Sequence, residues 1–176
     1  MTRNAWACML FVGIVAPLAA AADDTLLKFR GGVGVHPVSN VAGTANADGT
    51  FPNVTRNIVR GVNPPGQIWV IADLRADVKT DGRIKVRGKG LLLAGGNAIG
   101  QNAGQSVFAT LICEAAAPFT LRNTNVAGVP LQPDGDFAID DVLSPAPGDC
   151  ASPVLLIRQV GGQNWFAAGF VKSDDD

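Results

Sequence analysis

Six of the fourteen Lys and Arg residues lie in LRADVKTDGRIKVRGKG, the stretch from Leu74 to Gly90. Guanidinium and ammonium groups bind anionic groups through charge-assisted hydrogen bonds. The stretch is therefore either a binding face for a polyanion or the solvated side of a β-hairpin. The second interpretation is favoured, because such charges also discourage aggregation between sheet edges. The candidate binding residues are Trp69, Arg83, Lys85, Arg87 and Lys89.

A second cluster of ionisable residues lies in PDGDFAIDD, which supplies Asp134, Asp136, Asp140 and Asp141. Calcium takes about six to eight oxygen ligands, and neighbouring Asp residues can supply several of them. Paired carboxylates are also the catalytic unit of most glycosidases. However, the spacing does not fit an EF-hand loop, and Asp134-Gly135 is common turn chemistry. A structural role is favoured, with a calcium site and a secreted carboxylate-based hydrolase as alternatives.

Residues for other catalytic or metal chemistry are sparse. His36 is the only histidine, and it precedes Pro37 in a glycine-rich stretch that predicts a surface loop. A zinc site would need further ligands, and no serine lies in a GxSxG elbow. The stretches GGVGV and GGNAIGQNAG lack the strand–loop–helix setting of a phosphate cradle. We therefore expect no catalytic residue, no conventional metal site and no cofactor.

The first 22 residues are typical of a secretory signal peptide. Arg3 supplies the charged start, residues 6–18 the apolar core, and residues 19–22 a small-residue cleavage site before Asp23. The apolar core is short for a membrane span, and no later segment approaches one. We expect a mature chain of residues 23–176 that forms a single domain in the periplasm or outside the cell.

Two of the three cysteines, Cys113 and Cys150, lie in the expected mature chain. Export to an oxidising compartment predicts that they form one disulfide. The alternative, two thiols in a redox or metal role, lacks a CxxC spacing and a nearby histidine.

Short apolar or alternating segments separated by glycine- and proline-rich turns predict β-strands throughout. Their regular spacing favours an all-β antiparallel sandwich, with a closed β-barrel as the alternative. The expected strands are 25–35, 54–62, 67–79, 83–93, 106–113, 119–123, 137–143, 154–160 and 164–171.

The hairpin around Gly82 can be placed in register, because residues opposite each other must share a face. A two-residue loop would place Val78 opposite a lysine, whereas the three-residue loop 80–82 places Val78 opposite Ile84. That loop needs a left-handed residue at its third position, which Gly82 supplies. The charged pairs are then Asp77 with Lys85, Asp73 with Lys89, Arg75 with Arg87, and Lys79 with Arg83. The expected apolar face of the first strand is Val70, Ala72, Leu74, Ala76 and Val78.

At the open end of this hairpin, Trp69 and Ile71 face Leu93 and Leu91, so both sides of the ribbon are apolar there. The patch is either covered by the loop 95–105 or exposed for docking. Coverage is the favoured prediction.

The net charge of -1 argues against a dedicated nucleic-acid-binding protein. The segment RGVNPPGQIWVIADLRADVKTDGRIKVRGKGLLL (60–93), together with DGDFAI and Cys150, resembles a group of small exported bacterial proteins without an established activity. The resemblance implies an exported all-β domain and no particular site residues. We therefore expect a non-enzymatic binding or structural module whose partner is an acidic glycan, an envelope polymer, a lipid headgroup or another protein.

Overall fold

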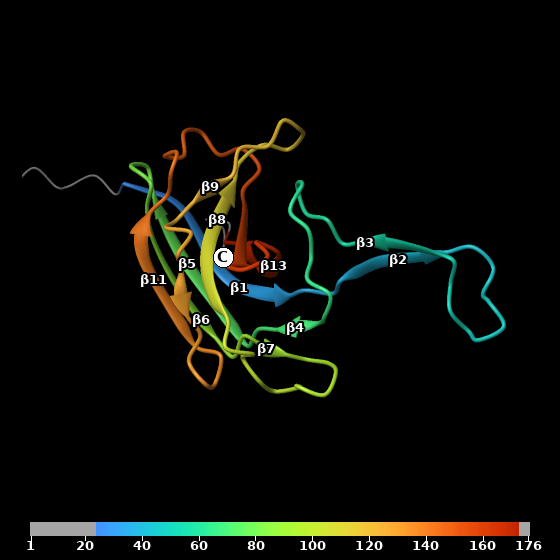
Figure 1. Cartoon of the computed structure of the whole chain (residues 1–176). Helices are drawn as coiled ribbons and strands as arrows, with labels where there is room; N and C mark the ends of the chain where they lie inside the picture. The colour runs from blue at the N-terminus through green and yellow to red at the C-terminus, as the bar shows by residue number, and fades with distance from the viewer. Residues whose placement is uncertain (1–23, 173–176) are drawn as a thin grey trace, which may run out of the picture.

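The computed structural model of the chain describes residues 24–172, which form strands and loops without a helix (Figure 1). The expected signal peptide and the acidic tail after Lys172 lie outside the described residues. Within residues 24–172, no helix could cross a membrane. The strands are β1 (Thr25–Gly34), β2 (Val38–Ala42), β3 (Asn53–Arg56), β4 (Trp69–Val70), β5 (Asp73–Lys79), β6 (Arg83–Lys89), β7 (Leu92–Leu93), β8 (Ser106–Ile112), β9 (Arg122–Asn123), β10 (Val129–Pro130), β11 (Phe137–Val142), β12 (Val154–Gln159) and β13 (Trp165–Val171).

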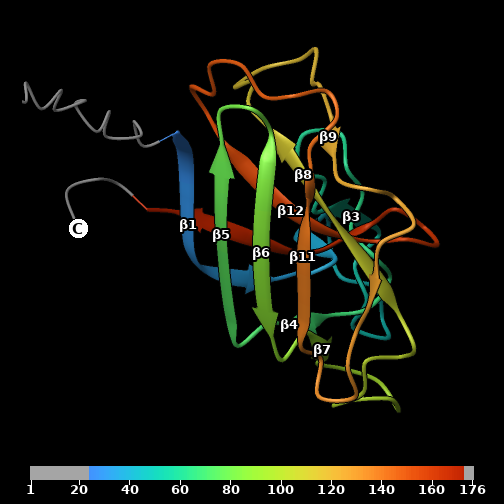
Figure 2. The same ribbon diagram turned by 90° about the vertical axis from the view of Figure 1, so that its left-hand side faces the viewer.

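Nine strands form one antiparallel sheet in the order β10, β8, β12, β13, β1, β5, β6 and β11, with β9 also paired to β8. The right-handed twist of neighbouring strands lets so large a sheet curl on itself. Figure 2 shows β1, β5, β6 and β11 on one side of the curl, with β8 and β12 behind them. The all-β antiparallel prediction is confirmed. The barrel considered as the alternative describes the shape more closely than two separate sheets.

The curled sheet leaves one seam, between the terminal strands β10 and β11, which do not pair. These strands are joined by a turn in which Gly135 N donates to Gln132 O at 2.8 Å. Beyond the other end of β11, Asn123 and Ser144 exchange two backbone hydrogen bonds, which close the seam there. The seam is thus a bounded opening in an otherwise continuous wall.

Apolar side chains fill the inside of the curl. The alternation of β5 and β6 sends Leu74, Ala76, Val78, Ile84 and Val86 inward, and each is at most 1% exposed. The other large, fully buried side chains include Phe29, Phe108, Phe166, Leu91, Leu111, Ile112, Leu143, Leu155, Leu156 and Ile157. Phe108 is not part of the core cluster, since the guanidinium of Arg158 lies over its ring, 5.1 Å from the centroid.

The predicted register of the β5–β6 hairpin is confirmed. Val78 lies opposite Ile84, and the charged pairs Asp73–Lys89, Arg75–Arg87 and Asp77–Lys85 are all present. Gly82 has a φ of 90° and donates its N–H to Lys79 O at 3.0 Å. The loop and the apolar pattern therefore specify the same alignment.

The sequence predicted two continuous strands, 67–79 and 83–93. In the structure each is interrupted, between Val70 and Asp73 and between Lys89 and Leu92. Val70 and Ala72 were expected on the buried face, but both are exposed, and Val70 is 48% exposed. On the first strand, the face that points into the core changes between Ala72 and Asp73. On the second strand it changes at Gly90, which has a φ of 63°. Trp69 then points inward, because burying its large ring removes more apolar surface from water than burying Val70.

The apolar end of the hairpin is covered, as predicted. The ring of Trp69 stacks on Phe166, with centroids 4.0 Å apart and an interplanar angle of 15°. The loop 95–105 is tied to β7, since Leu93 N donates to Gln101 O at 3.0 Å and Gly100 N donates to Leu93 O at 2.8 Å. This patch is part of the core rather than a docking surface.

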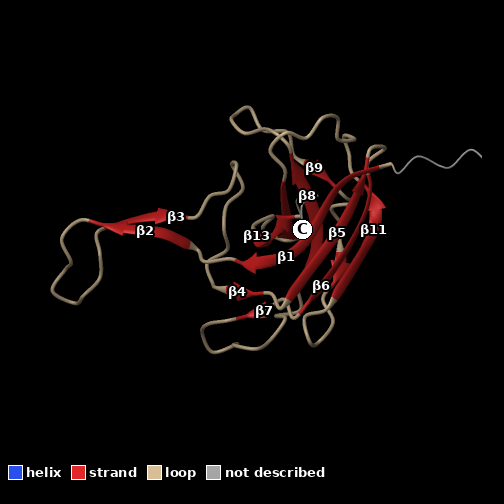
Figure 3. Cartoon of the chain, turned by 180° about the vertical axis from the view of Figure 1, so that it is seen from behind, coloured by secondary structure: helices blue, strands red, loops and turns tan. Residues whose placement is uncertain are grey.

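A two-stranded ribbon, β2 with β3, extends away from the curled sheet (Figures 1 and 3). The sequence did not predict β2, and the strand expected over 54–62 ends at Arg56. We call residues 38–56 the arm.

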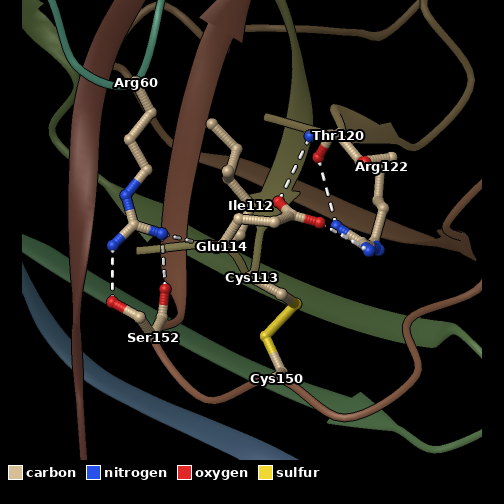
Figure 4. The surroundings of a disulfide bond; sticks show 8 residues. All are labelled: Arg60, Ile112, Cys113, Glu114, Thr120, Arg122, Cys150 and Ser152. Atoms are coloured by element: carbon tan, nitrogen blue, oxygen red, sulfur yellow. Dashed lines mark hydrogen bonds and ion pairs between the residues drawn. A yellow bond between two sulfur atoms is a disulfide. The ribbon is translucent and has the colours of Figure 1, made fainter. Parts of the chain in front are cut away.

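The predicted disulfide between Cys113 and Cys150 is present, with a Cα–Cα separation of 4.5 Å (Figure 4). Beside it, Arg60 donates to Ser152 Oγ at 2.6 Å and to the carbonyl of Ile112 at 3.3 Å. On the other side, Arg122 pairs with Glu114 at 2.9 Å. This pairing and a bond from Thr120 N lower the pKa of Glu114 to about 2.

Candidate anion-binding face

The basic residues of the hairpin lie on the outer face of β1, β5, β6 and β11. This follows from strand alternation, because residues beside Leu74, Val78 and Val86 must point to solvent. The register of β1 adds Lys28, opposite Asp77, and Arg30, opposite Arg75. The cations of this basic face are Lys28, Arg30, Arg75, Lys79, Arg83, Lys85, Arg87 and Lys89, and its carboxylates are Asp24, Asp73, Asp77, Asp81 and Asp140.

With Asp136, which lines the pocket beside Arg87 and Lys89, the basic face carries eight cations and six carboxylates, an excess of two positive charges, although the whole chain is at -1. Arg30, Arg75 and Arg87 lie opposite one another on three adjacent strands. Like charges in register repel one another, so an anion that lies across this row would relieve the repulsion. The row is one feature of the face that favours an anionic ligand.

Most cations of the basic face have carboxylate partners. Arg30 pairs with Asp77 at 2.8 Å and Arg75 with Asp73 at 2.9 Å. The other pairs are Lys79–Asp24 at 2.7 Å, Arg83–Asp24 at 2.8 Å, Arg83–Asp81 at 2.6 Å and Lys85–Asp140 at 3.1 Å. Solvent-exposed pairs of this kind contribute little to stability and exchange readily.

The turn end of the face is its most neutralised part. A hydrogen bond from Lys79 lowers the pKa of Asp24, and hydrogen bonds from Arg83 lower the pKa of Asp81. Asp81 and Asp24 in turn raise the pKa of Arg83. Both carboxylates are therefore charged at neutral pH and offset the cations beside them.

Arg87 and Lys89 differ from these neighbours, because neither forms an ion pair with any residue in 24–172. They border a pocket of about 430 Å³ at the seam. Its other walls come from both sides of the seam, through the apolar Val129 and Pro130 on β10 and Phe137 and Ala138 on β11, and through the polar Gln132 and Asp136 between them. Unneutralised cations beside an apolar recess suit an anionic group carried on a ring or short chain.

Gly88 lets β11 lie close to β6 at this pocket. The ring of Phe137 lies across Gly88, and a Cβ on that residue would be 2.0 Å from a ring carbon. At the rim, Asp136 accepts a hydrogen bond from Gly90 N at 3.0 Å. Gly88 thus shapes the pocket, although it carries no side chain that could bind a ligand.

Trp69, the fifth candidate, does not belong to the basic face. Only 4% of it is exposed, and its ring stacks on Phe166. It borders a separate pocket of about 400 Å³, together with Leu93, Ala98 and Gln159. The hairpin therefore has its charged end and its aromatic end on different surfaces.

The four candidate calcium ligands are dispersed along β11 and the turn before it. Asp134 accepts from Asp136 N at 3.1 Å, and Asp140 pairs with Lys85. Asp141 accepts from Asn125 N and from Val142 N, both at 2.7 Å, so it bridges the seam. Among residues 24–172, no three His, Cys, Asp or Glu side chains group as a metal site. Each of these carboxylates makes an interaction within the fold.

Lys28 and Arg30 were missed by the sequence analysis. They alternate with the apolar Leu27 and Phe29, so their orientation to solvent was predictable. Their position beside Asp77 and Arg75 was not, because β1 and β5 are separated in sequence by the arm.

No protein-family model matches this chain, and no curated protein or solved structure matches it either.

Proposed function

We propose that the protein is an exported, non-enzymatic binding module of the cell envelope or extracellular space, and that its basic face holds an acidic glycan or another anionic envelope polymer. The observation that carries this proposal is the pair Arg87 and Lys89, two exposed cations without a carboxylate partner among residues 24–172, beside a pocket of about 430 Å³.

The form of the face favours a polymer over a single small anion. Cations recur along β6 at every second residue, about 6.6–7 Å apart. They also recur across β1, β5 and β6, at the strand spacing of about 4.8 Å. A chain with repeated anionic groups can contact several of these cations, and each contact adds to its affinity.

The pocket gives the face a preference among anions. Pro130, Ala138 and Val129 offer apolar surface to the C–H face of a sugar ring, while Arg87 and Lys89 meet its carboxylate or sulfate. This combination favours acidic polysaccharide over inorganic phosphate.

Export rests on the leader-like residues 1–22 and on the resemblance of residues 60–93 to exported bacterial proteins. The Cys113–Cys150 disulfide is compatible with an oxidising compartment. Expression of the full chain in a bacterial host, followed by fractionation and mass measurement, should give an exported product beginning at Asp23. A cytoplasmic product that keeps Met1 would reject export.

Binding is tested on protein purified after expression of the full chain, by titration with heparin, polygalacturonate and neutral dextran at low and high salt. Binding to both polyanions, weaker at high salt and absent with dextran, is expected because salt screens exposed charges. Vesicles containing phosphatidylglycerol form a separate arm. Binding to these vesicles without binding to either glycan would assign the face to lipid headgroups instead.

A matched pair of variants then locates the site. Arg87→Ser with Lys89→Ser and Arg83→Ser with Lys85→Ser remove the same charge from alternating positions of β6. Loss of the two cations at the pocket should weaken polygalacturonate binding about tenfold, and loss of the two ion-paired cations about twofold to threefold. Equal losses would mean that net charge alone acts, and no binding by the wild type would reject the function.

A further inference from the structure

The arm is a ribbon whose one face carries three valines and Arg56 and whose other face is mainly polar. Val41 lies opposite Val54, and Val38 lies opposite Arg56. A bulge between Val38 and Asn40 keeps the two valines of β2 on one side, although they are three residues apart. Opposite residues share a face, so Val38, Val41 and Val54 form one surface, with Arg56 beside Val38 at its root end, and we call this surface the valine face. The reverse face carries Asn40, Thr55, Ala42 and Asn53.

The valine face is open to solvent. Val38, Val41 and Val54 are 42%, 46% and 53% exposed, and Phe51 near the tip is 41% exposed. An isolated two-stranded ribbon is at most marginally stable in water, and a sheet normally buries its apolar face. The arm therefore has the pattern of an element that packs on something outside the chain.

The root of the arm is firmly held. Asn57 donates its backbone N–H to Pro37 O and its side-chain amide to His36 O, both at 3.0 Å. Its carbonyl accepts the indole N–H of the buried Trp165 at 2.9 Å. Arg56 donates to Pro64 O at 2.6 Å. These bonds tie the root of the arm to the body of the protein.

We propose that the valine face packs on the valine face of a second copy of this chain, with the two arms antiparallel. The charges of the arm identify this partner. Asp48 at the tip and Arg56 near the root are the only Asp, Glu, Lys or Arg residues in 37–57. Antiparallel packing brings each tip near the root of the other arm, so two Asp48–Arg56 attractions form at once. Parallel packing would instead place like charges together.

A two-fold contact also needs only one patch, used by both subunits. Three valines and a nearby phenylalanine make a small contact, below the roughly 1,200 Å² of stable interfaces. The dimer is therefore reversible, and it forms with rising protein concentration. It goes beyond the proposed function, because the arm and the basic face share no residue.

Sedimentation velocity over a concentration series tests the dimer, using protein purified after expression of the full chain. The expected result is a monomer at low concentration and a dimer at high concentration. Val54→Asp should shift the equilibrium to monomer by at least tenfold, because it places a charge in the contact. Thr55→Asp is the matched control, since it adds the same charge at the next residue, on the reverse face. It should dimerise like the wild type.

Each outcome of this test decides the proposal. A wild type that stays monomeric at all concentrations overturns it, as does a dimer that survives Val54→Asp or is lost equally in Thr55→Asp. If Val54→Asp unfolds, Val41→Thr with Val54→Thr replaces it, because threonine keeps the shape of valine. Asp48→Asn can keep the hydrogen bonds that Asp48 accepts from Thr50 while removing its charge, so it should weaken the dimer. An unchanged dimer in Asp48→Asn would reject the antiparallel arrangement.

Discussion

The β5–β6 hairpin and the arm are both antiparallel ribbons with one apolar face, but they differ in what that face meets. Val86 and Val78 of the hairpin are at most 1% exposed, whereas Val41 and Val54 of the arm are about half exposed. The hairpin has β1 on one side and β11 on the other, and the sheet curls its apolar face inward. The arm has no neighbouring strand within residues 24–172. An amphipathic ribbon therefore needs sheet neighbours, and not only its own pattern, to bury its apolar face.

The prediction with the largest expected effect places the same charge on each ribbon. Val86→Asp puts a carboxylate into the core, and a buried unpaired charge costs more than about 4 kcal/mol. We expect loss of cooperative unfolding in a thermal melt. Val54→Asp should change the free energy of unfolding of the monomer by about 0.5 kcal/mol or less. Similar effects of the two variants would show that the arm is packed.

Removal of the disulfide tests the body of the protein without touching either ribbon. Cys113→Ala with Cys150→Ala opens a loop of about 38 residues, and the chain-entropy model predicts a loss of about 4 kcal/mol. Chemical denaturation should show this loss. The concentration dependence of dimerisation, measured under conditions where the variant is folded, should not change. A dimer lost together with the disulfide would tie the arm to the disulfide region.

A glycine substitution tests how tightly the hairpin is enclosed. Gly88→Ala would force the Phe137 ring to move, because the added carbon meets it at 2.0 Å. Overpacking of this kind costs about 1–3 kcal/mol. Phe137→Leu in the same chain should recover part of the loss. Gly66→Ala is a suitable control, since no atom lies within 4 Å of its added carbon.

The smallest expected effect is the contribution of Glu114 to acid stability. Arg122 and Thr120 lower its folded-state pKa from 4.5 to about 2. A carboxyl with a lowered pKa stabilises the fold above its unfolded pKa and loses that contribution as the pH falls. Glu114→Gln should therefore be less stable than the wild type above pH 4.5, with the difference shrinking towards pH 2. An unchanged difference across this range would assign the effect to packing instead.

Much of the β5–β6 region was predictable because its signals are local. Alternation places Leu74 and Val78 on one face, and Gly82 selects the loop that aligns them with β6. The change of inward face at Ala72 was not predictable, since it depends on Phe166, far along the chain, which stacks on Trp69. β2 was missed because its residues lack the regular alternation of a buried strand, and a bulge interrupts what alternation they have.

The candidate site was predicted in part for the same reason. Alternation along β6 places Arg83, Lys85, Arg87 and Lys89 on one surface. It cannot show that Arg83 and Lys85 have carboxylate partners, because those partners lie on other elements. Asp24 directly precedes β1, and Asp140 lies on β11.

The sequence by itself determined an all-β chain, the register of its central hairpin and the cysteine pair, because each follows from alternation, turn chemistry or the count of residues. The tertiary structure alone decided how the sheet curls, where its seam lies, which cations lack partners and that a valine face stays exposed. These features depend on contacts between strands distant in sequence, and no local pattern specifies which strands will be neighbours.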